Sequence, residues 1–272
     1  MIARVHIAAI GVRAPGLAGW SGARAALTGT APFAPFAPDA VSAPASTLLA
    51  PAERRRLNPN AAWALAVATE ALDAAPPFER NTLASVFASA DGDGDVLAQT
   101  LAALAAPPVA VSPTLFHNSV FNAPACYTSS AHRLTGPSTS ICAGEYTFAV
   151  ALIDAVDQVL LDGCTVLFVA VDLAYPQSLA SMHASVPSFA CALLLCPSDS
   201  ALSCVHGSLA IASAAAFDAP PPIALPPWTG HWSRATAAAA LPLLAVIAGG
   251  APAALPLVQP AAAPLAVDYR PC

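Results

Sequence analysis

The chain has 272 residues, of which 57% are hydrophobic and only 10% charged, and its formal net charge is −6. An ordinary soluble domain has about 25% charged residues, so this chain has few charges with which to cover its surface. All of its basic residues are arginine, and the short run Arg54–Arg56 in an acidic chain does not indicate a nucleic-acid partner. The first residues lack the basic segment and long apolar core of a secretory signal, which predicts a cytoplasmic protein.

Apolar runs of two lengths alternate along most of the chain. Short runs predict strands at residues 5–10, 83–90, 138–142, 165–171 and 190–195, and longer runs predict helices at 61–72 and 145–161. This alternation predicts a layered α/β fold with a largely buried sheet. We expect it to form one domain over residues 1–217.

An acidic segment, Asp91-Gly92-Asp93-Gly94-Asp95, follows the strand predicted at residues 83–90. It begins like the calcium-binding loop of an EF-hand. The sixth position, however, is Val96 where that loop needs glycine, and the twelfth is Ala102 where it needs glutamate. We therefore interpret the segment as a solvated connection between a strand and a helix.

Residues between Ser112 and Glu145 follow an order found in one known family. Ser112-Pro113 is followed by Asn122, then by Gly136-Pro137-Ser138-Thr139-Ser140, and Glu145 comes seven residues after Ser138. The order resembles the pattern S-P…N…G-P-S-x-S-x-x-x-A-C of the β-ketoacyl-acyl carrier protein synthases, whose final cysteine is the nucleophile. This resemblance covers roughly residues 1–215. It implies the N-terminal half of a thiolase-like (ketosynthase) fold.

The run from Ser112 to Asn122, followed by an acidic residue in place of cysteine, is similar to a subgroup of chain-length factors. These are the inactive partners of ketosynthases in aryl polyene and xanthomonadin-type pigment biosynthesis. The resemblance implies a heterodimer with an active ketosynthase, an acyl carrier protein as a further partner, and neither cofactor nor metal. It also implies that a segment of this chain faces the partner's acyl pocket, with the candidate residues Leu115, Phe116, His117, Phe121 and Asn122.

Glu145 is the position on which a prediction of activity depends. A strand ending at Ile141, a small turn and a helix starting at about Glu145 place its carboxylate at a helix N-terminus, where the backbone dipoles favour a negative charge. The same field would activate a cysteine thiolate, whereas an acyl group on a carboxylate is an easily hydrolysed anhydride. The simpler alternative is that Glu145 is only a favourable first-turn acid, worth about 0.3–1 kcal/mol.

The resemblance also implies residues that this sequence lacks. Ketosynthases complete their active site with two histidines and a lysine from the second half of the fold, and this chain contains no lysine and ends before that half. Without donors that stabilise an enolate, we expect a catalytically silent subunit that helps set the length of its partner's product. Two alternatives stay open, a malonyl carrier-protein decarboxylase that uses Glu145 and a non-catalytic carrier-protein scaffold.

Histidine and cysteine offer weak further candidates. His117 has no carboxylate near it in the sequence to orient it, which favours a structural hydrogen bond over a catalytic role. The seven cysteines form no C-x-x-C pair and lie mostly in apolar runs, which predicts reduced, buried thiols. Cys142 would be a replacement nucleophile only if the turn came three residues earlier.

The last part of the chain, residues 218–272, is rich in proline and alanine. An apolar stretch at residues 235–258 has the length of a membrane span, for which about 20 residues are needed. Three prolines and two glycines interrupt it, however, and would disrupt a helix. We therefore expect a peripheral tail that packs on the domain, on its partner or on a membrane surface.

Overall fold

The computed structural model describes residues 2–33, 47–179, 181, 186–202, 204–217, 223–258 and 264–272. Its strands are β1 Val5–Ala14, β2 Leu17–Ala18, β3 Ala84–Ala88, β4 Ser138–Ile141, β5 Val166–Asp172, β6 Phe189–Pro197, β7 Ser208–Ser213, β8 Ala253–Val258 and β9 Leu265–Arg270. Its α-helices are α1 Gly19–Leu27, α2 Pro51–Arg54, α3 Pro59–Ala74, α4 Gly94–Ala105, α5 Pro113–Asn118, α6 Ala123–His132, α7 Thr147–Asp162 and α8 Leu241–Gly249. Short 3-10 turns are η2 Gly144–Tyr146, η3 Gln177–Leu179, η4 Ala214–Ala216, η5 Pro227–Trp232 and η6 Ala237–Ala240.

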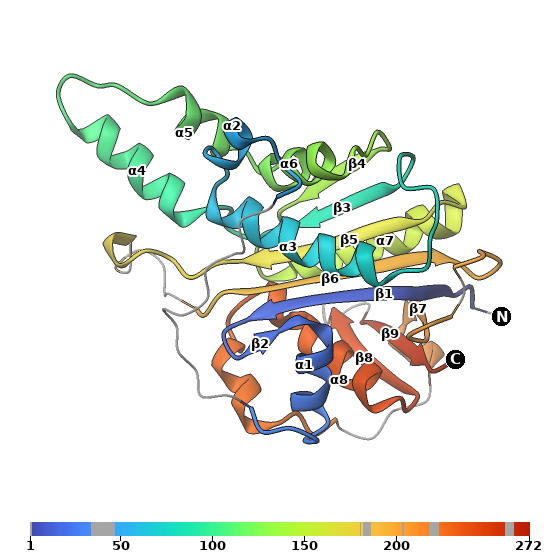
Figure 1. Cartoon of the computed structure of the whole chain (residues 1–272). Coiled ribbons are helices and arrows are strands. Elements are labelled where there is room, and N and C mark those ends of the chain that lie inside the picture. Colours follow the sequence, from blue (N-terminus) through green and yellow to red (C-terminus); the bar gives the residue numbers. More distant parts are fainter. Residues whose placement is uncertain are drawn as a thin grey trace.

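A mixed nine-stranded sheet with the order β4-β3-β5-β6-β1-β7-β9-β8 forms the centre of the described fold, and β2 pairs with β1 (Figure 1). β3 runs parallel to β4 and to β5, whereas the other neighbouring pairs are antiparallel. Helices α3 and α6 cover one face, and α1, α7 and α8 cover the other. This three-layer arrangement confirms the layered α/β fold expected from the sequence.

The central strands read as continuous apolar runs because both of their faces are buried. In β5, Phe168 and Ala170 pack on the α7 side, while Leu167 and Val169 pack on the α3 side. Burying a large apolar side chain such as Phe168 stabilises the fold by about 1.5–3 kcal/mol. The predicted strands and helices in this part of the chain are all present, with ends that differ by a few residues.

Helix α3 lies unusually close to β1, and the sequence fixes where the helix starts. Asn58 caps its start by accepting a hydrogen bond from the N–H of Ala61, with proline at the first helical position. A Cβ atom at Gly11 of β1 would lie 2.1 Å from the Val67 carbonyl oxygen of α3. Only glycine permits this approach, which brings the alanine-rich face of α3 into direct contact with the sheet.

The expected C-terminal tail is built into the domain in the residues that the structure describes. Strand β9 pairs with β7 along its full length, β8 pairs with β9, and α8 packs in the main hydrophobic core. Residues 218–222, where the tail was expected to start, lie outside the described residues. In residues 223–258 and 264–272 the apolar side chains cover the sheet, so of the three places expected for this segment the structure describes packing on the domain.

Over the described residues, no helix has both the length and the apolar character needed to cross a membrane. The apolar stretch that suggested a span is divided between η6, the nine-residue α8 and β8. Gly250 ends α8 in a left-handed conformation at φ +67°, which explains why the stretch does not continue as one helix.

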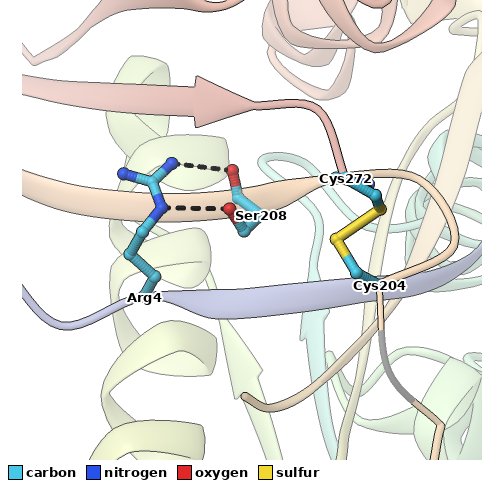
Figure 2. The surroundings of a disulfide bond; sticks show 5 residues. Arg4, Cys204, Ser208 and Cys272 are labelled. Carbon is cyan, nitrogen blue, oxygen red and sulfur yellow. Dashed lines mark hydrogen bonds between the residues drawn. A yellow bond between two sulfur atoms is a disulfide. The ribbon is translucent and has the colours of Figure 1, made fainter.

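Cys204 and Cys272 form a disulfide with a Cα–Cα distance of 5.6 Å, which corrects the prediction that all seven cysteines are reduced. The bond ties Cys272, which follows β9, to the segment before β7, and the Gly207 N–H donates a hydrogen bond to the Cys272 sulfur. Figure 2 shows Arg4 beside it, donating from its guanidinium to the hydroxyl and the carbonyl of Ser208. Sequence spacing gave no sign of this pair, because the two residues are 68 positions apart.

Removing the disulfide should destabilise the fold. Because the bond closes a loop of 68 residues, its loss in Cys272→Ser should lower the free energy of unfolding by about 2–4 kcal/mol. Urea denaturation measures this, with Cys126→Ser, an exposed free thiol, as the matched control. Alkylation of the denatured, unreduced protein should modify five cysteines. Modification of all seven, with equal stability of the two variants, would contradict the disulfide.

Asp172→Ala should also weaken the fold. The side chain, which is 6% exposed, accepts hydrogen bonds from the Ala90 N–H at 2.9 Å, the Ala237 N–H at 2.6 Å and the Thr236 hydroxyl. Truncation leaves these donors without their acceptor, so we expect a loss of about 2–4 kcal/mol in the free energy of unfolding. The exposed acid Asp157 supplies the control, Asp157→Ala. If the denaturation curves of the two variants superimpose, the hydrogen bonds of Asp172 do not stabilise the fold as expected.

Candidate functional site

The run around Gly136 sets the position of the strand that leads to Glu145. The N–H groups of Thr135 and Gly136 donate to the Asn81 carbonyl, and a Cβ atom at Gly136 would lie 2.3 Å from the Leu83 carbonyl oxygen. The Ser85 hydroxyl of β3 donates to the Ser138 hydroxyl at 3.0 Å. These close contacts hold β4 beside β3 in a parallel register.

The chain then turns from β4 into α7. Gly144 has a left-handed conformation at φ +57°, which favours glycine. The Thr147 hydroxyl accepts from the Ala143 N–H at 2.9 Å and donates to the Gly144 carbonyl at 2.7 Å. Glu145 lies in the 3-10 turn η2, one turn before α7, so the prediction that the helix itself starts at Glu145 is corrected by two residues.

Glu145 lines a cavity of about 200 Å³, here named the Glu145 cavity. The ends of β3 and β5 contribute Asp91 and Asp172, and the C-terminal segment contributes Arg234 and Thr236. The Glu145 side chain is exposed, so its carboxylate reaches solvent at the start of α7. Three of the lining side chains are acidic and Arg234 is the basic one among those the structure describes.

Asp172 is the most deeply buried acid of this cavity. Burial raises the pKa of the Asp172 carboxyl, and the donors Thr236, Ala90 and Ala237 act in the opposite direction. Through these bonds one carboxylate holds the end of β5, the end of β3 and the start of η6 together. Asp172 therefore shapes the cavity in which Glu145 lies.

Residues 94–118, with α4 and α5, project from the body of the fold (Figure 1). We call this segment the arm. Residues of the arm and of neighbouring loops line a second cavity, of about 240 Å³, which we call the arm cavity. The arm cavity shares Asp91 and Gly92 with the Glu145 cavity. Its other lining residues are Asn58, Asn60, Asp93, Val96, Leu97, Thr100, Asn118, Ser119, Val120, Phe121 and Pro124.

The five residues that the sequence assigned to a partner's pocket take different places. Phe121 lines the arm cavity and is 47% exposed, whereas Phe116 is 71% exposed on α5. Leu115 is half-buried, and Asn122 is exposed at the start of α6, where its carbonyl accepts from the Cys126 N–H. His117 is exposed and lies edge-on to Tyr127 at 6.0 Å between ring centroids.

The two weaker candidates, Cys142 and His117, make local contacts within the fold. The thiol of Cys142, which precedes the turn, donates to the Ala90 carbonyl at 3.0 Å. His117 lines a separate cavity together with Cys126 and Tyr127. Neither residue lines the Glu145 cavity as the structure describes it.

Sequence reasoning missed several polar residues of the two cavities. Asp172 ends β5 after the apolar run Val166–Val171, and acids at the carboxyl end of a strand are a recognised signal of a site. Asp93, interpreted as part of a solvated loop, caps α4 by accepting from the Val96 N–H and also accepts from the Asn60 N–H. Asn60 and Arg234 carried no signal, because only the fold brings them to these cavities.

The comparisons with known proteins agree with this geometry. Residues 30–220 match the family model described as "Beta-ketoacyl synthase, N-terminal domain". No curated protein matches the chain. Several solved structures do match it.

One similar chain belongs to the structure "Ketosynthase (ApeO) in Complex with its Chain Length Factor (ApeC) from Xenorhabdus doucetiae", with 21% identity, a TM-score of 0.67, and coverage of 97% of this chain and 98% of that one. A chain of "The ishigamide ketosynthase/chain length factor" has 15% identity, a TM-score of 0.73, and coverage of 98% and 99%. A chain of the AntDE:AntF complex, a type II polyketide acyl-carrier protein with its ketosynthase, has 13% identity and a TM-score of 0.62 over 79% of this chain and 70% of that one. At these identities the structures establish the fold, and the family model establishes the family. The chain therefore belongs to the β-ketoacyl synthase family and has the layered fold of a ketosynthase N-terminal half.

Proposed function

We propose that this chain is a catalytically silent, chain-length-factor-type subunit, which pairs with an active β-ketoacyl-acyl carrier protein synthase and helps shape its acyl tunnel. The observation that carries the proposal is Glu145. Glu145 follows strand β4 and the turn at Gly144. The resemblance to the ketosynthase motif assigns this position to the nucleophile. A carboxylate there cannot hold an acyl group in a form that survives water long enough to be condensed.

The charges around Glu145 support a silent site over a decarboxylase. A malonyl group carries a carboxylate, and its decarboxylation leaves an enolate that must be stabilised by donors or cations. The Glu145 cavity presents Glu145, Asp91 and Asp172 against Arg234 in the part of the chain that the structure describes. Carboxylates that line the same cavity oppose both the bound malonyl group and the developing enolate.

Exposed apolar side chains support a protein partner. Phe116, Val120 and Phe121 are each at least 46% exposed, and all three lie within six residues of one another on and after α5. Among described strands, β4 pairs only with β3, and its residues Ser138-Thr139-Ser140-Ile141 carry no charge. An uncharged, unpaired edge strand is a surface that proteins normally cover. A partner seated across β4 and α5 would cover both features.

The similar structures also support a paired subunit, since two of them are complexes of a ketosynthase with a chain length factor and a third contains an acyl-carrier protein. We extend their pairing to this chain as part of the proposal. Its setting would be type II biosynthesis of a polyene or fatty-acid-type product in the cytoplasm, with the acyl carrier protein delivering the growing chain.

Glu145→Ala tests whether the site at position 145 is catalytically inactive. In the complex co-expressed with the partner ketosynthase, elongation of a malonyl carrier protein should require this chain and should change by less than about twofold on substitution. Asp157→Ala, at an exposed acid of the following helix α7, is the control. If carbon dioxide release falls a hundredfold or more with Glu145→Ala alone, the chain is a decarboxylase.

Phe116→Ala tests the length-setting role. If Phe116 limits the partner's tunnel, removing its ring should shift the products of the complex to longer chains, which mass spectrometry of the carrier-bound products measures. Leu161→Ala, at a side chain that is 82% exposed near the end of α7, is the matched control. An unchanged product distribution in a fully assembled heterodimer would contradict the length-setting role of Phe116 and favour the scaffold alternative.

A further inference from the structure

The strands β1, β7 and β9 carry a row of polar side chains across one face of the sheet. His6 of β1 lies opposite Ser208 of β7, and Ser208 lies opposite Arg270 of β9. Residues directly opposite in neighbouring strands share one face of a sheet, and Asp268, two residues before Arg270, shares it too. The buried apolar cluster on the α3 side includes residues of β1, β5 and β6, but none of β7 or β9 among those the structure describes. The row therefore lies where that cluster does not extend.

Two arginines in this region share one carboxylate. Nη1 of Arg4 donates to Oδ2 of Asp268 at 2.6 Å, and Nε of Arg270 donates to the same oxygen at 3.2 Å. Arg4 also donates to the hydroxyl and the carbonyl of Ser208 (Figure 2) and to the carbonyl of Asp268, so its guanidinium is held in place. Because one acid serves two cations, the group of Arg4, Asp268 and Arg270 carries one positive charge in excess.

Arg270 is the arginine of this group that can bind a further molecule. Its side chain is 65% exposed. Nε is the guanidinium nitrogen that has a partner among the described residues, which leaves both terminal nitrogens free to donate. Two parallel N–H groups of a guanidinium match the two oxygens of a carboxylate or phosphate. The bond from Nε to Asp268 already orients the guanidinium, and this lowers the cost of binding such a group.

These charged groups line a cavity of about 750 Å³, here named the β9 cavity. It shares no described lining residue with the Glu145 cavity or the arm cavity. Among its described lining residues Asp268 is the one acid, and it faces two arginines. Apolar surface comes from Ile2, Leu160 and Phe217. An accessible guanidinium beside apolar side chains is suited to a molecule that has an anionic group and an apolar body.

We propose that the β9 cavity binds a small organic anion, in which a carboxylate or phosphate group is joined to an apolar group. The terminal nitrogens of Arg270 donate to the oxyanion, and the fixed guanidinium of Arg4 adds its positive charge. Leu160 and Phe217 contact the apolar part. This site is independent of the proposed function, because it shares no described residue with the cavity of Glu145.

Benzoate, benzamide and benzamidinium test the preference for an anion, because they have nearly the same shape and differ in charge. Titration of the purified full-length chain, followed by NMR, should give a dissociation constant at least about fivefold lower for benzoate or phenyl phosphate than for benzamide. The tighter of these two anions identifies the preferred oxyanion. Benzamidinium should bind no more tightly than benzamide. Added salt should reduce the advantage of the anion, since it screens exposed charges.

Arg270→Gln tests whether the exposed guanidinium is the group that holds the anion. The substitution leaves the bond between Arg4 and Asp268 in place, and the advantage of the anion over benzamide should fall below about twofold. Arg55→Gln, at an exposed arginine outside the β9 cavity, removes the same charge and should leave the advantage intact. If both variants lose it equally, the binding reflects only the overall charge of the chain and the proposal is wrong.

Ala216→Trp tests the location of the site without changing any charge. Ala216 is exposed and lines the β9 cavity, so a large side chain there should occupy the space and abolish binding of the anion. Ala215→Trp, at the exposed neighbouring residue that does not line the cavity, is the matched control. Equal affinity for the anions and benzamide in the unmodified chain, no binding of any of them, or binding that survives Ala216→Trp would each overturn the proposal.

Discussion

The buried carboxylate of Asp172 is the interaction on which the arrangement of the site depends. It lies at the end of the central strand β5 and accepts hydrogen bonds from the end of β3 and from the start of η6. The C-terminal segment that carries Arg234 and Thr236 is thereby fixed against the two strands that end beside Glu145. An acid so deeply buried is tolerated because three donors surround it, and the same donors would be orphaned without it. One side chain thus joins the C-terminal segment to the Glu145 cavity.

The strand, turn and helix around Glu145 are held in place by contacts that do not involve the Glu145 side chain. The turn at Gly144, the bonds of Thr147 and the packing of Gly136 against Leu83 all fix the backbone, and none of them depends on the side chain at position 145. The backbone groups at the start of a helix favour a negative charge of either kind, thiolate or carboxylate. Glutamate is accordingly accommodated without repacking, because its side chain points into solvent and the cavity.

The low charge content of the chain has a structural explanation in two parts. Alanine-rich helices lie close to the sheet, as at Gly11 and Val67, so much of the apolar composition is core. A further part is exposed on the arm, where Leu97, Leu101, Leu104 and Phe116 are all at least 42% exposed. Exposed apolar patches of this kind mark interaction surfaces. Composition alone could not separate these two contributions.

The sequence by itself determined the layered α/β class, the central strands and the turn before α7, because apolar runs of strand and helix length are local signals that one or two turns of chain already carry. The order of Ser112-Pro113, Asn122 and the Gly136 run is likewise readable along the chain. It indicated the family, which the family model matching residues 30–220 confirms. Only the tertiary structure decided that the C-terminal segment completes the sheet, that Cys204 meets Cys272, and that Asp172, Asn60 and Arg234 line cavities beside Glu145 and Phe121. These contacts join residues tens of positions apart. Their formation depends on how the whole chain packs, a property that no local pattern of side chains encodes.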